Sequence, residues 1–104
     1  MSAAAEPIPS VTVAEVSGRD PSSVLLDVRE DDEWAAGHAP DAVHVPMSRI
    51  SLDDVPAGRP VYCICRSGNR SGRVTEALVH AGVEAFNVTG GMIAWSDAGL
   101  PVVH

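Results

Sequence analysis

Short apolar runs that favour β-strands alternate with helical patterns along most of this chain. The clearest strand covers residues 24–28, an apolar run bounded by serines and charged residues. The clearest helix ends at Gly82, because the apolar residues at positions 74, 77, 78 and 81 share one face. Parallel strands need crossover connections, which are usually helices, so the alternation predicts βα units and a sheet with helices on both faces. The expected fold class is α/β.

The remaining elements follow the same alternation. A short helix should begin with Asp31 as its N-cap and end before Gly37. Residues 1–9 are interpreted as a flexible N-terminal arm and residues 10–104 as a single domain. The other predicted strands cover residues 9–13, 42–45, 60–64 and 85–88, and the shorter predicted helices cover residues 14–16, 31–36 and 92–97.

The chain has 104 residues, enough for one domain with a core of its own. Its net charge of −7 argues against nucleic acid or an anionic membrane as a partner. No apolar run approaches the ~20 residues that span a bilayer. The N-terminus has neither the basic nor the apolar region of a signal peptide, which predicts a cytoplasmic location. Cys63 and Cys65 are too close for an unstrained disulfide, so at least one free thiol is expected, as in a reducing compartment.

Positive charge gathers directly after Cys65 in a chain that is otherwise acidic and contains no lysine. The segment from residue 65 to residue 74 holds Arg66, Arg70 and Arg73 and no acidic residue. Cys65 follows a predicted strand, and parallel sheets place their ligand sites at the carboxyl ends of strands. The combination indicates an anion-binding cradle around a thiolate.

The loop from Arg66 to Asn69 has the composition of an anion nest. Gly68 permits backbone conformations closed to other residues, so successive N–H groups can turn toward one anion. The N-terminal end of the following helix adds positive charge at the same place. We therefore expect Cys65 to be an exposed nucleophile with a lowered pKa, the alternative being a buried strand cysteine. Cys63 lies inside the apolar run and is expected to pack in the core, the alternative being a resolving thiol.

Three sequence motifs occur in order along the chain. They are LDVRE running into EW and GHAP (residues 26–30, 33–34 and 37–40), CRSGNRS (residues 65–71) and GGMIAW (residues 90–95). Together they resemble the single-domain rhodaneses, a family of sulfurtransferases, over about residues 10–103. One departure is Asp41, where the family more often has glycine. The resemblance implies a mostly parallel, five-stranded central sheet with helices on both faces.

The resemblance also implies a sulfur-transfer cycle at Cys65 as the catalytic residue. Its thiolate would take the outer sulfur of a small anionic donor, thiosulfate or a persulfide, and pass it from a cysteine persulfide to a thiol or protein acceptor. The anion nest agrees with this chemistry, because donor and persulfide are both anionic. No cofactor or metal is implied, and the histidines lack ligand spacing. The substrate-binding residues would be Arg66, Ser67, Gly68, Asn69 and Arg70.

Two other functions fit part of the pattern. Phosphatases and arsenate reductases also have a cysteine loop that ends in arginine, with five residues between the two. Cys65 and Arg70 have four residues between them, which favours a ligand smaller than a phosphoryl group. A non-catalytic or partner-specific rhodanese-like binding module would be expected to lose the cysteine, which this chain keeps.

Charged and aromatic residues outside the loop have structural interpretations. Asp27 and Arg29 end a strand on the same side of the sheet as Cys65; Asp27 should organise nearby backbone, and Arg29 should pair with an acid. His38 is expected to be a hydrogen-bonded structural histidine. Trp34 and Trp95 are expected to anchor the core.

Overall fold

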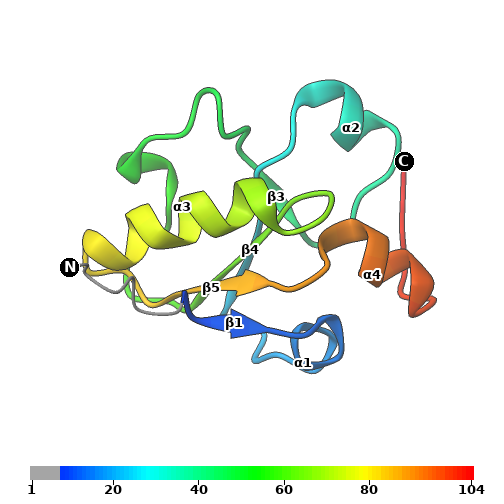
Figure 1. The fold of residues 1–104 in the computed structure, drawn as a ribbon, viewed down its shortest axis with the longest axis horizontal. Helices are drawn as coiled ribbons and strands as arrows, with labels where there is room; N and C mark the ends of the chain where they lie inside the picture. Colours follow the sequence, from blue (N-terminus) through cyan, green and yellow to red (C-terminus); the bar gives the residue numbers. More distant parts are fainter. Residues whose placement is uncertain (1–7) are drawn as a thin grey trace.

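The computed structural model describes residues 8–104 (Figure 1). Each strand is followed by a helical segment, as the alternation in the sequence predicts. The 3-10 helix η1 is the one segment that the sequence did not predict. The elements in chain order are β1 (Ser10–Val11), α1 (Val13–Ser17), β2 (Val24–Asp27), α2 (Asp31–Ala35), β3 (Val43–His44), η1 (Leu52–Asp54), β4 (Val61–Ile64), α3 (Asn69–His80), β5 (Ala85–Val88) and α4 (Gly91–Asp97).

Within residues 8–104, five strands form one sheet in the order β1-β5-β4-β2-β3, and all four pairings are parallel. The predicted parallel sheet is therefore confirmed, with every described pairing parallel rather than most of them. β4 is the central strand, and its residue Cys63 pairs with Leu26 on one side and Asn87 on the other. The residue that follows β4 consequently lies in the middle of the sheet's carboxyl edge.

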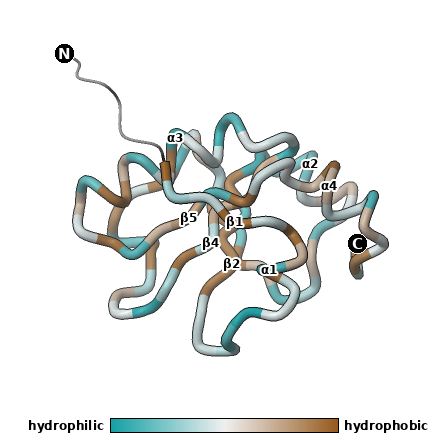
Figure 2. The backbone as a smooth tube through the Cα atoms, turned by 60° about the horizontal axis from the view of Figure 1, so that its bottom comes forward, coloured by the Kyte–Doolittle hydropathy of each residue, from teal (hydrophilic) through white to brown (hydrophobic). Residues whose placement is uncertain are grey.

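Apolar side chains pack on both faces of the sheet, since successive strand residues point to opposite sides. On one face, α3 packs against β4 and β5 and buries Val74 and Leu78. On the other face, α1 contributes Val16 and α4 contributes Trp95 to a second buried cluster. Figure 2 shows apolar segments on the neighbouring strands β2 and β4 at the centre of the molecule. Helices on both faces are thus confirmed.

The start of α2 differs from the prediction. Glu30, rather than Asp31, is the N-cap, and its backbone N–H donates to the Glu33 carboxylate at 3.1 Å. Short polar side chains are the usual N-caps, so the sequence favoured the aspartate. The predicted arm over residues 1–9 lies outside the described residues except for its last two, and there the Pro9 carbonyl accepts a hydrogen bond from the Asn87 N–H at 2.8 Å. No helix of the described part of the chain is long and apolar enough to cross a bilayer.

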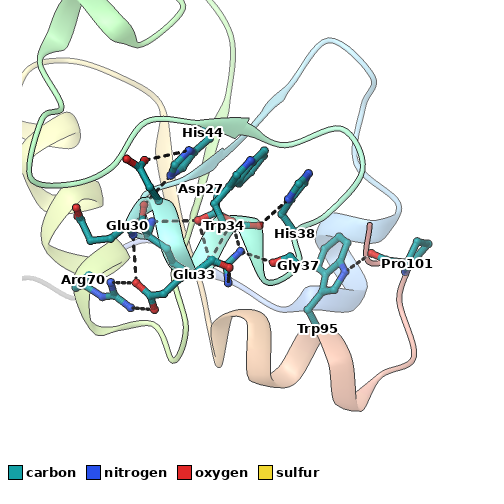
Figure 3. A network of polar contacts seen from close by, with 12 residues as sticks. Asp27, Glu30, Glu33, Trp34, Gly37, His38, His44, Arg70, Trp95 and Pro101 are labelled. Atoms are coloured by element: carbon teal, nitrogen blue, oxygen red, sulfur yellow. Dashed lines mark hydrogen bonds and ion pairs between the residues drawn. The ribbon is translucent and has the colours of Figure 1, made fainter. Parts of the chain in front are cut away.

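The two tryptophans have different environments. Trp95 anchors the core as predicted: it is 3% exposed, and its indole N–H donates to the Pro101 carbonyl. The prediction for Trp34 is wrong, because its indole is half-buried and stacks between the imidazoles of His38 and His44, with ring centroids 3.5 and 4.6 Å away (Figure 3). His38 Nδ1 lies 2.9 Å from the Trp34 carbonyl oxygen, which confirms a structural role for this histidine.

Candidate active site

Cys65 is the first residue beyond β4, at the middle of the sheet's carboxyl edge. It belongs to the buried cluster on the α3 side of the sheet, together with Cys63. Cys65 is 1% exposed, so the expectation of an exposed thiol is wrong. Cys65 is nevertheless not an ordinary core cysteine, because hydrogen-bond donors contact its sulfur.

The Cys65 sulfur accepts hydrogen bonds from the loop and from the first turn of α3. The Gly68 N–H lies 3.1 Å from Sγ, and the Ser71 hydroxyl lies 3.2 Å from it. Burial is the largest single influence on the pKa of Cys65 and raises it. The Ser71 hydroxyl and the backbone N–H groups of Ser71, Gly68 and Ser67 together outweigh burial, so the pKa lies below the usual thiol value. The predicted direction of this shift is confirmed.

Cys63 shows what burial does where no backbone N–H groups of the loop donate to the sulfur. Cys63 is completely buried, and burial raises the pKa of its thiol to about 11, although a hydrogen bond with Thr75 acts in the opposite direction. Cys63 is therefore neutral near pH 7 and packs in the core, as the sequence predicts. The two cysteines are free, with no disulfide between them.

The loop conformation depends on Gly68, which has a φ of +107° and is the N-cap of α3. Residues other than glycine rarely adopt this backbone conformation. The Gly68 carbonyl accepts a hydrogen bond from Asn87 Nδ2 at 3.0 Å, so β5 holds the turn from the side. The turn in this orientation directs the Gly68 N–H toward the Cys65 sulfur.

The first turn of α4 holds the other side of the loop. Met92 N–H donates to the Cys65 carbonyl at 2.8 Å, and Ile93 N–H donates to the Arg66 carbonyl at 3.0 Å. Gly91 has no room for a side chain, since a Cβ there would lie 2.3 Å from the Cys65 carbonyl oxygen. One glycine of the third sequence motif therefore has a structural reason: Gly91 lets the start of α4 approach the loop after Cys65 closely.

Arg70 forms a two-pronged ion pair with Glu33 of α2 (Figure 3). Arg70 Nη1 lies 2.6 Å from Glu33 Oε1, and Nη2 lies 2.7 Å from Oε2. The hydrogen bonds from Arg70 lower the pKa of Glu33 to about 2, and the carboxylate in turn raises the pKa of Arg70. Both terminal nitrogens of Arg70 are thus already bound to a carboxylate, which joins the start of α3 to α2.

The other two arginines differ from Arg70. Arg66 is exposed and, within residues 8–104, forms no ion pair. Ser67 and Asn69 are also exposed. Arg73 is exposed on the next turn of α3, where it lines an apolar groove with residues such as Ile50. The structure therefore leaves Arg66 as the loop's unpaired guanidinium in the described part of the chain.

Arg29 pairs with an acid, as the sequence predicts: its partner is Asp27, and both residues are buried. Asp27 Oδ1 accepts from the backbone N–H of Arg29 at 3.0 Å, which confirms that Asp27 organises nearby backbone. The Arg29 guanidinium donates to Asp27 and to the carbonyls of Gly37 and Glu33. This pair fixes α2 against the end of β2 and so positions the Glu33 carboxylate for Arg70.

Sequence reasoning missed three polar residues of this site. Ser71 is the last residue of the loop motif, and the available signal was a hydroxyl six residues after the cysteine, in the first turn of the helix. Glu33 also lay within a motif, as an acid without an assigned partner. Asn87 had no signal, because it comes from β5 and meets the loop only in the fold. Within residues 8–104, no three His, Cys, Asp or Glu side chains are grouped to hold a metal ion.

The fold and the loop define an α/β domain with a cysteine of lowered pKa at the end of its central strand. The chain belongs to the Rhodanese-like domain family, which it matches over residues 12–98. A putative sulfurtransferase of Bacillus subtilis is 38% identical over 96 residues, covering 90% of this chain and 93% of that protein. A protein of Allochromatium vinosum described as a sulfurtransferase is 40% identical over 83 residues, covering 77% and 78% of the two chains.

Other relatives are longer or are known by structure. An uncharacterized protein of Synechocystis is 41% identical over 83 residues, and this chain spans only 46% of that protein's length. A crystal structure of a rhodanese-related protein from Thermoplasma volcanium has a TM-score of 0.85 and 30% identity, covering 91% of this chain and 97% of that one. The expected family and fold are therefore confirmed.

Proposed function

We propose that the chain is a sulfurtransferase that carries a sulfane sulfur on Cys65. The observation that carries this proposal is the ring of N–H and O–H donors on the Cys65 sulfur, which lowers the pKa of a buried thiol. A thiol that is ionised without a separate base is a nucleophile for sulfur. The sulfurtransferase descriptions of two relatives support the same reaction class.

The first half of the reaction loads the cysteine. The thiolate attacks the outer sulfur of thiosulfate, a Cys65 Sγ–S bond forms, and the S–S bond of thiosulfate breaks. Sulfite leaves with the electron pair, and the negative charge of the thiolate passes to the outer sulfur of the new persulfide. No proton is transferred, so the loop needs to stabilise an anion before and after the step.

The second half of the reaction removes the sulfur from Cys65. A thiolate acceptor, from a small molecule or a protein, attacks the outer sulfur; a new S–S bond forms on the acceptor, and Cys65 leaves as thiolate. With cyanide as the acceptor, a C–S bond forms and thiocyanate is released. Both halves balance without a cofactor or a metal.

The loop residues have separate proposed roles. Arg66, exposed and without a carboxylate partner in residues 8–104, would bind the sulfonate of the donor. The backbone N–H groups of Ser67, Gly68 and Asn69 would surround the transferred sulfur. Arg70, already bound to Glu33, would hold the loop and add charge from a distance. Because the thiol is 1% exposed, donor entry requires the exposed loop side chains to move aside.

Two alternative functions can be distinguished from sulfur transfer by the substrates that the chain turns over. A phosphatase or arsenate reductase would hydrolyse a phosphotyrosine analogue, or reduce arsenate, faster than it turns over thiosulfate. A binding module would show neither activity. The loop of four residues between Cys65 and Arg70 favours sulfur transfer over phosphoryl or arsenate chemistry, and the retained Cys65 favours it over a binding module. Parallel assays of the wild-type chain with thiosulfate, a phosphate ester and arsenate decide among them.

The direct test is the mass of the intact protein after incubation with thiosulfate. We expect one added sulfur, about 32 Da, on the wild type and on Cys63→Ser, and none on Cys65→Ser. Turnover of thiosulfate should follow the same pattern. A folded Cys63→Ser variant without adduct, or a Cys65→Ser variant that still turns over, would contradict the assignment.

A further inference from the structure

The Ser71 hydroxyl has two acceptors within reach and one proton to give. Its oxygen lies 3.2 Å from the Cys65 sulfur and 2.6 Å from Asn87 Oδ1. Ser71 is completely buried, so bulk water does not supply a third partner. A serine hydroxyl donates one hydrogen bond at a time. The two contacts are therefore alternatives for donation, not simultaneous bonds.

The orientation of the Asn87 amide is fixed by its other contact. Asn87 Nδ2 lies 3.0 Å from the Gly68 carbonyl oxygen, which can only accept. The amide nitrogen must face Gly68, and Oδ1 must then face Ser71. Asn87 Oδ1 is itself only an acceptor, so the Ser71 proton is the group that can satisfy it there.

The charge on the Cys65 sulfur decides whether the Ser71 hydroxyl donates to that sulfur or to Asn87 Oδ1. When Cys65 is a thiolate, its sulfur is an anion and attracts the Ser71 proton more strongly than Asn87 Oδ1 does. When Cys65 is a neutral thiol, its S–H can donate to the Ser71 oxygen, and the Ser71 proton is free for Asn87. When Cys65 carries a persulfide, the charge is on the outer sulfur, and Sγ is a weak acceptor. The proton again has its better partner in Asn87.

We propose that Asn87 is a positioning residue that acts on Cys65 through the Ser71 hydroxyl and favours the states in which Sγ carries no charge. The proposal rests on the proposed function for its persulfide state. Asn87 supplies the buried Ser71 proton with an acceptor after sulfur is loaded, a state in which an unpaired buried hydroxyl would otherwise cost free energy. Asn87 thereby favours loading of sulfur over retention of the bare thiolate.

The remaining charges near the loop do not change over the pH range of this exchange. Arg66 and Arg70 are guanidinium groups with permanent charge. The pKa of Glu33 is lowered to about 2, and the pKa of Cys63 is raised to about 11. Residues 85–93 of β5 and α4 contain no titratable side chain.

The test is a double-mutant cycle with Asn87→Ala and Ser71→Ala. Two quantities are measured for each protein: the pH profile of Cys65 alkylation by iodoacetamide, and the persulfide fraction at equilibrium in a fixed mixture of thiosulfate and sulfite. Asn87→Ala also removes the contact with Gly68, and it does so in both backgrounds. Subtracting the effect measured in the Ser71→Ala background therefore isolates the part that passes through the hydroxyl.

The expected results have opposite signs. After subtraction, Asn87→Ala should raise the thiolate fraction at a pH below the midpoint by roughly three- to tenfold, the worth of one hydrogen bond. It should lower the persulfide-to-thiolate ratio by a similar factor. An equal effect of Asn87→Ala in both backgrounds, or a fall in both quantities, would show that Asn87 only supports the loop and would overturn the proposal.

Two further points keep the cycle decisive. Asn87→Leu, which preserves volume and removes both polar atoms, replaces Asn87→Ala if the alanine variant does not fold by circular dichroism. The alkylation arm needs no sulfur transfer. If the wild type forms no persulfide, the proposed function fails while alkylation still tests Asn87; if persulfide forms but the alkylation cycle shows no coupling, the positioning role alone fails.

Discussion

Replacing Glu33 by glutamine tests whether the ion pair with Arg70 stabilises the fold. The substitution keeps an oxygen that can accept from the Glu30 N–H and removes the negative charge that Arg70 binds. The pKa of Glu33 falls from 4.5 to about 2, and at 1.36 kcal/mol per unit this corresponds to about 3 kcal/mol. The two side chains are 32% and 27% exposed, so screening by solvent reduces the figure to about 1–1.5 kcal/mol.

The assay is the free energy of unfolding in urea, supported by thermal melting. A loss of this size should lower the Tm of a domain this small by roughly 5–10 °C at pH 7. Asp31→Asn is the matched control, since Asp31 also lies in the first turn of α2 and pairs with an arginine, but Asp31 and its partner Arg49 are both mostly exposed. The control should change stability much less than Glu33→Gln.

The pH dependence gives the sharper refutation. The folded-state pKa of Glu33 is depressed, so its contribution to stability is present above pH 4.5 and is lost as the pH falls toward 2. The difference between the wild type and Glu33→Gln should therefore shrink over that window. A difference that stays constant down to pH 2, or a Glu33→Gln variant no less stable than Asp31→Asn at pH 7, would refute the reasoning.

Three further outcomes are expected. Arg66→Ala should raise the KM for thiosulfate by roughly ten- to a hundredfold, the loss of one charge-assisted contact, while Arg73→Ala leaves KM unchanged; equal effects would remove Arg66 from the binding role. Gly91→Ala should lower unfolding free energy by about 3 kcal/mol, because a Cβ would lie 2.3 Å from a carbonyl oxygen. The control Gly82→Ala shares a positive φ but has open space, so about 1 kcal/mol is expected from urea unfolding. The rate of Cys65 alkylation by a neutral reagent should have its midpoint below the usual thiol pKa of about 8.5. A midpoint at the usual value would contradict the claim that the loop donors lower the pKa of Cys65.

Features that depend on neighbouring residues in the sequence could be predicted. The run into Cys65, the glycine at the turn and the periodicity of α3 are local, and they were enough to place an activated cysteine at a strand end. The family resemblance added the number of strands. The lowered pKa follows from backbone N–H groups of the same loop, which the sequence itself specifies.

Features that depend on distant partners could not be predicted. The loop composition indicated positive charge at Arg70, but the carboxylate that binds it is 37 residues away along the chain. The contact of Asn87 with Ser71 likewise needs the alignment of β5 beside β4. Trp34 lies in an amphipathic segment, and such a pattern does not distinguish packing in the core from stacking between two histidines.

The hydrogen bonds from α4 and β5 make the loop after Cys65 dependent on the C-terminal part of the chain. β5 and α4 follow Cys65 along the chain, so the segment around the cysteine does not itself contain all the groups that hold the loop. Without β5 and α4, the carbonyls of Cys65 and Arg66 lack their partners in α4, and the turn at Gly68 lacks Asn87. We therefore expect a fragment that ends before β5 to lose the loop conformation that directs the Gly68 N–H toward the Cys65 sulfur.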